Sequence, residues 1–331
     1  MSALAPTLQA FFTERLIRQR QVSPHTIAAY RDTLRLLLTY TAARTGVPPS
    51  RLDLADLDAA VIAGFLDHLE TDRGNSARTR NARLAAIHSL FRFAALQHPE
   101  NAASISRVLA IPSKRADQAL ITHLADDEVD ALLAACDRST WTGRRDHALL
   151  LLAVQTGLRI SELTGLTCRD VHLSAGAGAH VACHGKGRKD RITPLTATTV
   201  AVLRVWFTER AGEPGTPLFP TRTGHPLSRD AIEHRIAHYT GVAANRCPSL
   251  RSKTITAHVL RHTCAMRLLQ AGVDTSVIAL WLGHVSVETT QIYLHADLSL
   301  KEQALARTRP PTSPPGRYRP PDEILAWLEA L

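Results

Sequence analysis

The chain has 331 residues, enough for two domains, and its 45% hydrophobic and 21% charged residues are typical of a folded globular protein. Basic residues outnumber acidic residues by nine and the pI is about 9.7, which favours a polyanionic partner, either nucleic acid or an acidic membrane. The sequence has no run of 18 apolar residues and no basic start followed by an apolar stretch. Neither a transmembrane helix nor a signal peptide is therefore expected.

Cysteine and glycine patterns exclude further classes of protein. The five cysteines are scattered and form no C-x-x-C pair, which argues against a disulfide framework or a zinc ribbon and favours a reducing cytoplasm. Gly185-Lys186 is followed by Gly187 instead of Ser or Thr. The phosphate-binding loop of ATPases is therefore not expected.

The first third of the chain has the periodicity of amphipathic helices. Apolar residues recur at helical spacing over 26–43, 59–70 and 76–96. Ser23-Pro24 places a capping residue before a proline, which is typical of a helix start. We therefore expect a helical N-terminal domain.

The third of these helices is expected to face phosphate groups. No acidic residue lies between Arg73 and Gln97, whereas a solvated helix face usually mixes both signs of charge. Salt-sensitive contacts to a DNA backbone are made by such arginine-rich faces. The residues expected on this outer face are Arg78, Arg80 and Arg83.

A linker and a proline-rich tail divide the chain into parts. Residues 113–123 contain a basic pair and a proline boundary but no periodicity, so we place the domains at 1–112 and 124–309. Both parts carry a net positive charge, as expected if both contact one polyanion. Residues 310–331 form a proline-rich tail that ends in a short amphipathic segment.

The second domain is expected to be mostly helical with one β-hairpin. Two short strand-like runs flank the basic string GKGRKD within residues 180–195. Gly157 is expected to end the helix that precedes the hairpin. Helices are expected over 126–136, 144–156, 197–210, 228–244, 257–271, 275–282, 287–294 and 299–306.

Five short strings of the second domain concentrate hydrogen-bond donors. They would bring together two guanidinium groups, an ammonium group, two imidazoles and a phenol, a set that suits the charge of a pentacoordinate phosphate. A tyrosine phenol can act as a nucleophile and leave a covalent phosphodiester. Its pKa of about 10 requires activation by nearby cations and a proton acceptor. The strings are TGLRISEL (156–163), HGKGRKDR (184–191), HVLRHT (258–263), LGH (282–284) and TTQIYLHAD (289–297).

The order of these strings resembles the tyrosine recombinase (phage integrase) family, with a Xer-like two-domain organisation. R-I-S-E-L is followed by G-K-G in a hairpin, then by H-x-L-R-H-T, L-G-H and T-T-x-x-Y. The nine-residue step from His284 to Tyr293 also fits the family. Near the start, S-P-H-T-x-x-x-Y-R-x-x-L resembles the family's helical core-binding domain. The resemblance covers residues 8–306.

The resemblance implies a role for each reactive residue. Arg159 and Arg261 would bind the scissile phosphate, and His284 would bond one of its non-bridging oxygens. Lys186 would protonate the leaving 5′-oxygen. Tyr293 would attack the phosphorus and form a 3′-phosphotyrosine.

Further roles follow from the same resemblance. His258 would accept the proton of the tyrosine, and Glu162 would orient its arginine and histidine neighbours. Arg188 and Lys189, beside the G-K-G turn, would contact the DNA backbone. His262, four residues after His258, is interpreted as structural.

The implied architecture is mainly α. A SAM-like helical domain and a mostly helical α/β catalytic domain with a small antiparallel sheet would clamp double-stranded DNA that carries inverted-repeat core sites. Four protomers would assemble on DNA, with the C-terminal tail of one docking on another. Because the phosphodiester energy is retained, neither ATP nor a metal nor another cofactor is required. The protein would act in the cytoplasm on the nucleoid, in integration, excision or resolution of a DNA element, with accessory proteins left open.

Three alternatives remain open from the sequence. Residues 265–284 contain a helix, a glycine turn and a second helix, so a non-catalytic helix-turn-helix regulator is one of them. His258 and His262 have metal-ligand spacing, but Val259 stands where a zinc hydrolase needs its glutamate. A type IB topoisomerase shares the phosphate chemistry, although the small helical first half is more typical of a recombinase.

Overall fold

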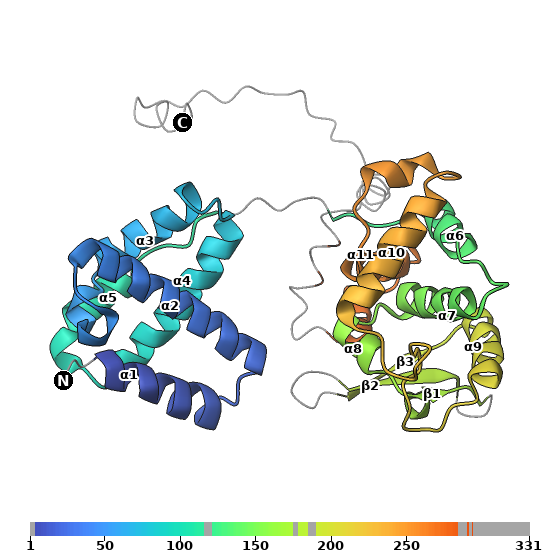
Figure 1. Cartoon of the computed structure of the whole chain (residues 1–331), viewed down its shortest axis with the longest axis horizontal. Helices are drawn as coiled ribbons and strands as arrows, with labels where there is room; N and C mark the ends of the chain where they lie inside the picture. The colour runs from blue at the N-terminus through green and yellow to red at the C-terminus, as the bar shows by residue number, and fades with distance from the viewer. Residues whose placement is uncertain are drawn as a thin grey trace, which may run out of the picture. The chain divides into compact units, whose positions relative to one another are not determined.

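The fold is mainly helical with one small antiparallel sheet, as predicted (Figure 1). The computed structural model describes residues 4–115, 121–174, 178–184 and 190–283, together with residues 290 and 293. Among these residues, no helix combines the length and the apolar character needed to cross a membrane. The chain divides into two compact units, Met1–Ala119 (unit 1) and Leu120–Leu331 (unit 2).

Unit 1 is a helical bundle around one apolar core. Its centre includes Leu37, Phe65 and Leu90, each at most 1% exposed. The predicted helix start is confirmed, because the Ser23 hydroxyl accepts a hydrogen bond from the backbone N–H of Thr26. The helices are α1 (Leu4–Ala10), continued by a π-helical stretch (Phe11–Gln19), α2 (Pro24–Thr45), α3 (Ala59–Thr71), α4 (Ala77–Ala94) and α5 (Ala102–Leu109).

The arginines of α4 do not share one face. Arg78 is exposed and Arg83 is half-buried, but Arg80 is only 5% exposed. The Nη1 group of Arg80 donates a hydrogen bond of 2.9 Å to the carbonyl of Pro112, and its Nε lies 3.9 Å from a carboxylate oxygen of Glu70. The prediction that Arg80 lies on the outer face is therefore wrong, because this side chain ties the end of unit 1 to the inner side of α4.

Unit 2 packs helices around α7 and carries the sheet at one side (Figure 1). The predicted hairpin is confirmed as strands β2 and β3, whose antiparallel register pairs His184 with Asp190. The bounds of the elements are α6 (Asp126–Ala134), α7 (Trp141–Thr156), α8 (Ile160–Gly165), β1 (Val171–His172), β2 (His180–His184), β3 (Asp190–Pro194), α9 (Ala197–Arg210), α10 (Arg229–Ala243), α11 (Ala257–Gln270) and α12 (Thr275–Leu282).

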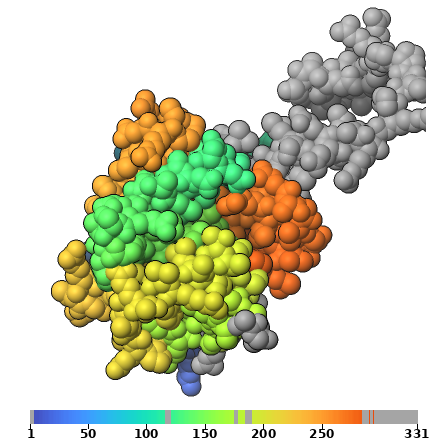
Figure 2. Space-filling view, turned by 90° about the vertical axis from the view of Figure 1, so that its right-hand side faces the viewer, coloured from blue at the N-terminus to red at the C-terminus, as the bar shows by residue number. Residues whose placement is uncertain are grey.

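The end of α7 is packed tightly against two later helices. Gly157 ends α7 with φ +63°, as predicted, and a Cβ at this position would lie 2.7 Å from Leu282 Cδ2 and 3.1 Å from Cys264 Cβ. Glycine is therefore needed for both the turn and the close approach of α11 and α12. In Figure 2, α12 (deep orange) lies at the surface of unit 2 beside α6 (blue-green), with α9 in yellow.

Candidate active site

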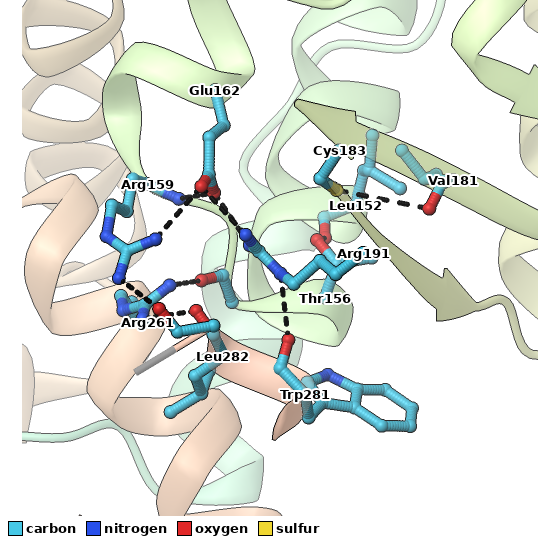
Figure 3. A network of polar contacts seen from close by, with 12 residues as sticks. Leu152, Thr156, Arg159, Glu162, Val181, Cys183, Arg191, Arg261, Trp281 and Leu282 are labelled. Carbon is cyan, nitrogen blue, oxygen red and sulfur yellow. Dashed lines mark hydrogen bonds and ion pairs between the residues drawn. The ribbon is translucent and has the colours of Figure 1, made fainter. Parts of the chain in front are cut away.

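Three arginines from separate elements bond the last turn of α12 (Figure 3). The last carbonyls of a helix lack intrahelical partners, and the helix dipole favours cations at this end. Three consecutive carbonyl oxygens each accept a hydrogen bond from a different guanidinium group. The bonds run from Arg191 Nε to Trp281 (3.0 Å), from Arg261 Nη2 to Leu282 (2.7 Å) and from Arg159 Nη2 to Gly283 (2.7 Å).

Glu162 joins two of these arginines. Arg159 caps the start of α8, and its backbone N–H donates to Glu162 Oε2 at 2.8 Å, while its Nη1 donates to Oε1 at 3.0 Å. Arg191 on β3 donates from Nη1 to Oε1 (2.8 Å) and from Nη2 to Oε2 (2.7 Å). Burial alone would raise the pKa of Glu162, but these hydrogen bonds and positive charges hold it below its usual value. The carboxylate is therefore ionised.

Arg261 is the most deeply placed of the three arginines. It is 3% exposed, and its Nη1 donates a 2.6 Å hydrogen bond to the carbonyl of Gly157 at the end of α7. Burial, helped by the charge of Arg159, lowers the pKa of Arg261 to about 10. The guanidinium group is still protonated at neutral pH, so the site is cationic.

Tyr293 lies beside this cationic cluster. Its side chain is 1% exposed, and its hydroxyl oxygen lies 3.0 Å from Nδ1 of His262 on α11. Burial raises the pKa of Tyr293 to about 12, although the charge of Arg261 acts in the opposite direction. A phenol in this environment stays protonated at physiological pH, so it needs a proton acceptor before it can attack phosphorus.

The two histidines of α11 form a pair next to the phenol. The His258 ring contacts the His262 ring edge to face, with centroids 4.2 Å apart. Burial lowers the pKa of His258, and the charges of Arg261 and Arg159 lower it further. Sequence reasoning treated His262 as structural, yet its ring nitrogen contacts the hydroxyl of Tyr293. The position of His262, directly after Arg261 in the sequence, was the signal that could have indicated a role in the site.

Several predicted site residues lie outside the residues that the structure describes. These residues are Lys186, Arg188, Lys189 and His284, and the predicted helices 287–294 and 299–306 are described only at Thr290 and Tyr293. The residues that flank segments 185–189 and 284–289 are described. The paired residues His184 and Asp190 bracket segment 185–189, and Gly283 immediately precedes His284.

A metal centre is not supported by the described side chains. Within residues 4–115, 121–174, 178–184, 190–283, 290 and 293, no group of three or more His, Cys, Asp and Glu residues is arranged to hold a metal ion. His262 of the His258–His262 pair instead contacts the phenol of Tyr293. The arrangement of a phenol, two imidazoles and three guanidinium groups suits phosphate chemistry.

The two units match two family models. The model described as "Phage integrase, N-terminal SAM-like domain" matches residues 10–98, and the model described as "Phage integrase family" matches residues 122–299. The chain belongs to the phage integrase family. As a Xer-like tyrosine site-specific recombinase, it is an enzyme, and neither a regulator without catalysis nor a zinc hydrolase describes it.

Relatives of this recombinase cover most or all of its length. The protein named "Putative integrase/recombinase y4rC" of Sinorhizobium fredii is 55% identical over 331 residues, which are 100% of this chain and 99% of the relative. "Tyrosine recombinase XerC" of Pelobacter propionicus is 34% identical, with 95% and 99% covered. The XerH site-specific recombinase bound to palindromic difH substrate has a TM-score of 0.68 at 27% identity, with 88% of this chain and 82% of that chain covered.

Proposed function

We propose that this recombinase cuts and rejoins double-stranded DNA at inverted-repeat core sites through a phosphotyrosine at Tyr293. The observation that carries the proposal is the buried phenol of Tyr293. Its hydroxyl contacts His262, and the nearby charge of Arg261 acts to lower its pKa, against the effect of burial. The net charge of +9 supports a DNA partner. The XerH structure contains a palindromic difH substrate, and a structure of similar fold, the Tn1549 transposon integrase, is in complex with transposon right end DNA, which supports a DNA substrate.

In the proposed cleavage step, a bond forms between the Tyr293 oxygen and the scissile phosphorus, and the bond from phosphorus to the 5′-oxygen breaks. The phenol proton passes to His258, which the lowered pKa leaves neutral at pH 7. Lys186 donates a proton to the departing 5′-oxygen. The products are a 3′-phosphotyrosine and a free 5′-hydroxyl.

The arginines stabilise the phosphate during this step. Arg159 is the more accessible, with 39% of its side chain exposed, and Arg261 supplies a second guanidinium group from beneath it. Forked donors match two non-bridging oxygens at once, which a lysine cannot do. His284, which follows the turn that both arginines bond, donates to the same phosphate.

The reverse step joins strands. A 5′-hydroxyl from a partner strand gives its proton to Lys186 and attacks the phosphotyrosine. The phosphorus–oxygen bond to Tyr293 breaks as a new phosphodiester forms, and His258 returns its proton to the Tyr293 oxygen. Each step exchanges one phosphate ester for another, and neither ATP nor a metal ion is consumed. Exchange between two duplexes requires four active chains, so we infer a tetramer on DNA, docked through the C-terminal tails.

The described state is a resting state for Tyr293. A side chain that is 1% exposed and bonded to His262 has to change position before its oxygen can approach a DNA phosphate. We infer that DNA binding or contact with a neighbouring protomer releases it. A chain that cleaves as an isolated monomer, at a rate independent of protein concentration, would contradict this release by a neighbour.

A nicked duplex tests the proposed reaction. Core sites are first selected from random inverted repeats by binding to the protein, and a nick is placed just 3′ of the scissile phosphate so that the released fragment diffuses away. The wild-type protein is expected to form a covalent adduct that survives denaturation and that EDTA does not prevent. Absence of an adduct, or its loss in EDTA, would contradict the proposal.

A further inference from the structure

Arg191 is the least expected member of the cluster around α12. It lies on β3, opposite Cys183 of β2, and its side chain is 10% exposed. All three of its guanidinium nitrogens are engaged, two by the carboxylate of Glu162 and one by the carbonyl of Trp281. Arg191 therefore connects the sheet to the start of α8 and to the end of α12 (Figure 3).

The single negative charge in the described part of the cluster is paired with Arg191, which leaves the positive charge of Arg159 available to bind a phosphate. Glu162 carries one negative charge and forms a two-bond fork with Arg191, the strongest type of arginine–carboxylate pair. This pair is neutral overall, so the positive charge of Arg159 is not cancelled. Arg159 makes only one side-chain bond to Glu162, at 3.0 Å, and directs its other amino group to Gly283.

Without Arg191 the same carboxylate would compete with a phosphate. Glu162 is 7% exposed, and a buried carboxylate that loses its partner draws the nearest cation. The nearest remaining cation is Arg159. Its single side-chain hydrogen bond to Glu162 would be replaced by a two-bond fork. The guanidinium group would then be neutralised and rotated away from the turn at Gly283.

The turn at Gly283 also depends on this side chain. Gly283 has φ +65°, and a Cβ there would lie 2.9 Å from Arg191 Nη1 and 3.2 Å from its Cδ. The backbone that leads into residue 284 thus packs directly on the arginine. One side chain fixes both the carboxylate beside Arg159 and the backbone turn after α12.

We propose that Arg191 is a positioning residue, which pairs with Glu162 so that Arg159 stays charged and directed at the phosphate site beyond the end of α12. The inference rests on the proposed DNA-cleaving function. Arg191 itself contacts no substrate in this account, because its charge is paired with that of Glu162. Its effect on the reaction passes through the charge and direction of Arg159, which itself bonds the carbonyl of Gly283.

The test compares two scissile groups in the nicked duplex described above. One is the natural phosphate, and the other is a methylphosphonate, in which a methyl group replaces a charged oxygen. A methylphosphonate carries no charge, so a reaction on it needs no charged arginine. Arg159→Ala, which removes the guanidinium group outright, provides the reference pattern.

For Arg191→Met, adduct formation on the phosphate is expected to fall by about 10- to 100-fold, as for other misplaced catalytic groups. Binding of the duplex is expected to stay within about twofold, because Arg191 contacts no DNA. On the methylphosphonate, the ratio of wild-type to variant rates is expected to approach one, as for Arg159→Ala. If Arg191→Met folds poorly, Arg191→Lys gives the same comparison. The ammonium group cannot form the two-bond fork with Glu162, so a loss is still expected, but it keeps a positive charge beside the carboxylate, so the loss should be smaller.

Arg144→Met is the matched control. Arg144 forms a two-bond fork with Glu209 (2.8 and 2.7 Å) and donates to the carbonyls of Arg138 and Ser139, but it lies at the opposite end of α7. Its loss should lower stability without changing the adduct rate on either substrate.

Two results would overturn the inference. They are a wild-type adduct rate for Arg191→Met on the phosphate, and an equal loss on both substrates, which would indicate a purely structural role. Either result would leave the proposed function standing, provided that the wild-type protein forms its adduct. Failure of the wild-type protein to form one would instead contradict the proposed function.

Discussion

The hydroxyl oxygen of Tyr293 lies 3.0 Å from Nδ1 of His262, which is 31 positions earlier in the chain. This contact joins the nucleophile of the proposed reaction to the helix that carries Arg261. It also covers the phenol, since Tyr293 is 1% exposed. The resting position of the nucleophile is thus stabilised by a specific polar contact as well as by burial.

Loss of the His262 imidazole should loosen the resting position of Tyr293. His262→Phe keeps a ring of similar size but leaves the hydroxyl without this partner, which costs about 1–3 kcal/mol of unfolding free energy. Nitration of Tyr293 by tetranitromethane, followed by peptide mass spectrometry, is expected to become faster. Tyr239 is an internal control, because its hydroxyl donates to Asp146 at 2.9 Å. Unchanged nitration of Tyr293 would show that His262 does not restrain it.

The lowered pKa of His258 should leave its imidazole neutral, and so able to accept a proton, at neutral pH. Burial and the charges of Arg261 and Arg159 lower the pKa of its imidazole, so the neutral form persists to a lower pH than the usual 6.5. NMR titration of the DNA-free protein is expected to show a midpoint below 6.5. Adduct formation should then fall on the acid side of neutrality and be independent of pH from neutrality up to the range where Arg261, with a pKa of about 10, begins to lose its proton. A midpoint above 7 would leave His258 mostly protonated at pH 7 and would contradict its role as the proton acceptor.

Glu128 should make the stability of unit 2 sensitive to acid. Its side chain is 2% exposed, and its carboxylate accepts hydrogen bonds from Lys253 Nζ (2.6 Å), the Ser249 hydroxyl (2.6 Å) and the backbone N–H of Ala125 (2.8 Å). Burial opposes ionisation, but these bonds lower the pKa of Glu128 below 4.5. The stabilisation is therefore complete above pH 4.5 and is lost as the pH falls through the lower folded-state value.

Urea unfolding at two pH values measures this effect. At pH 7, Glu128→Gln is expected to lower the free energy of unfolding by about 1–3 kcal/mol, and the difference from wild type should shrink well below pH 4.5. Glu209→Gln removes the carboxylate partner of Arg144, a side chain that is 24% exposed against 2% for Glu128, and should cost at most about 1 kcal/mol. An equal effect of Glu128→Gln at both pH values would mean that its charge contributes nothing.

The sequence predicted the elements that depend on local patterns. The limits of α12 were predicted without error, and those of α2 and α3 to within two residues, because their apolar periodicity and end signals lie within the helices themselves. The two-residue strand β1 was not predicted, since it exists only through its pairing with β2. The eight-residue helix α5 was also missed, because a short helix depends on packing more than on its own sequence.

The candidate site was predictable in its members but not in its contacts. Arg159, Arg261 and Tyr293 stand in recognisable strings, whereas nothing in the string HGKGRKDR distinguishes Arg191 from the other basic residues around it. Its role becomes visible only in the structure, where β3 places its guanidinium group within hydrogen-bond distance of Glu162. Arg80 illustrates the opposite error, because a basic helix surface in the sequence concealed a buried contact to Pro112.

The most direct test of the central claim is the identity of the nucleophile. The wild-type protein and Tyr293→Phe are incubated with the nicked core-site duplex, and the denatured products are digested and analysed by mass spectrometry. The account predicts one DNA-linked peptide that contains Tyr293 in the wild type, and no adduct but unchanged duplex binding for Tyr293→Phe. An adduct formed by Tyr293→Phe, or a linkage at another residue of the wild type, would contradict it.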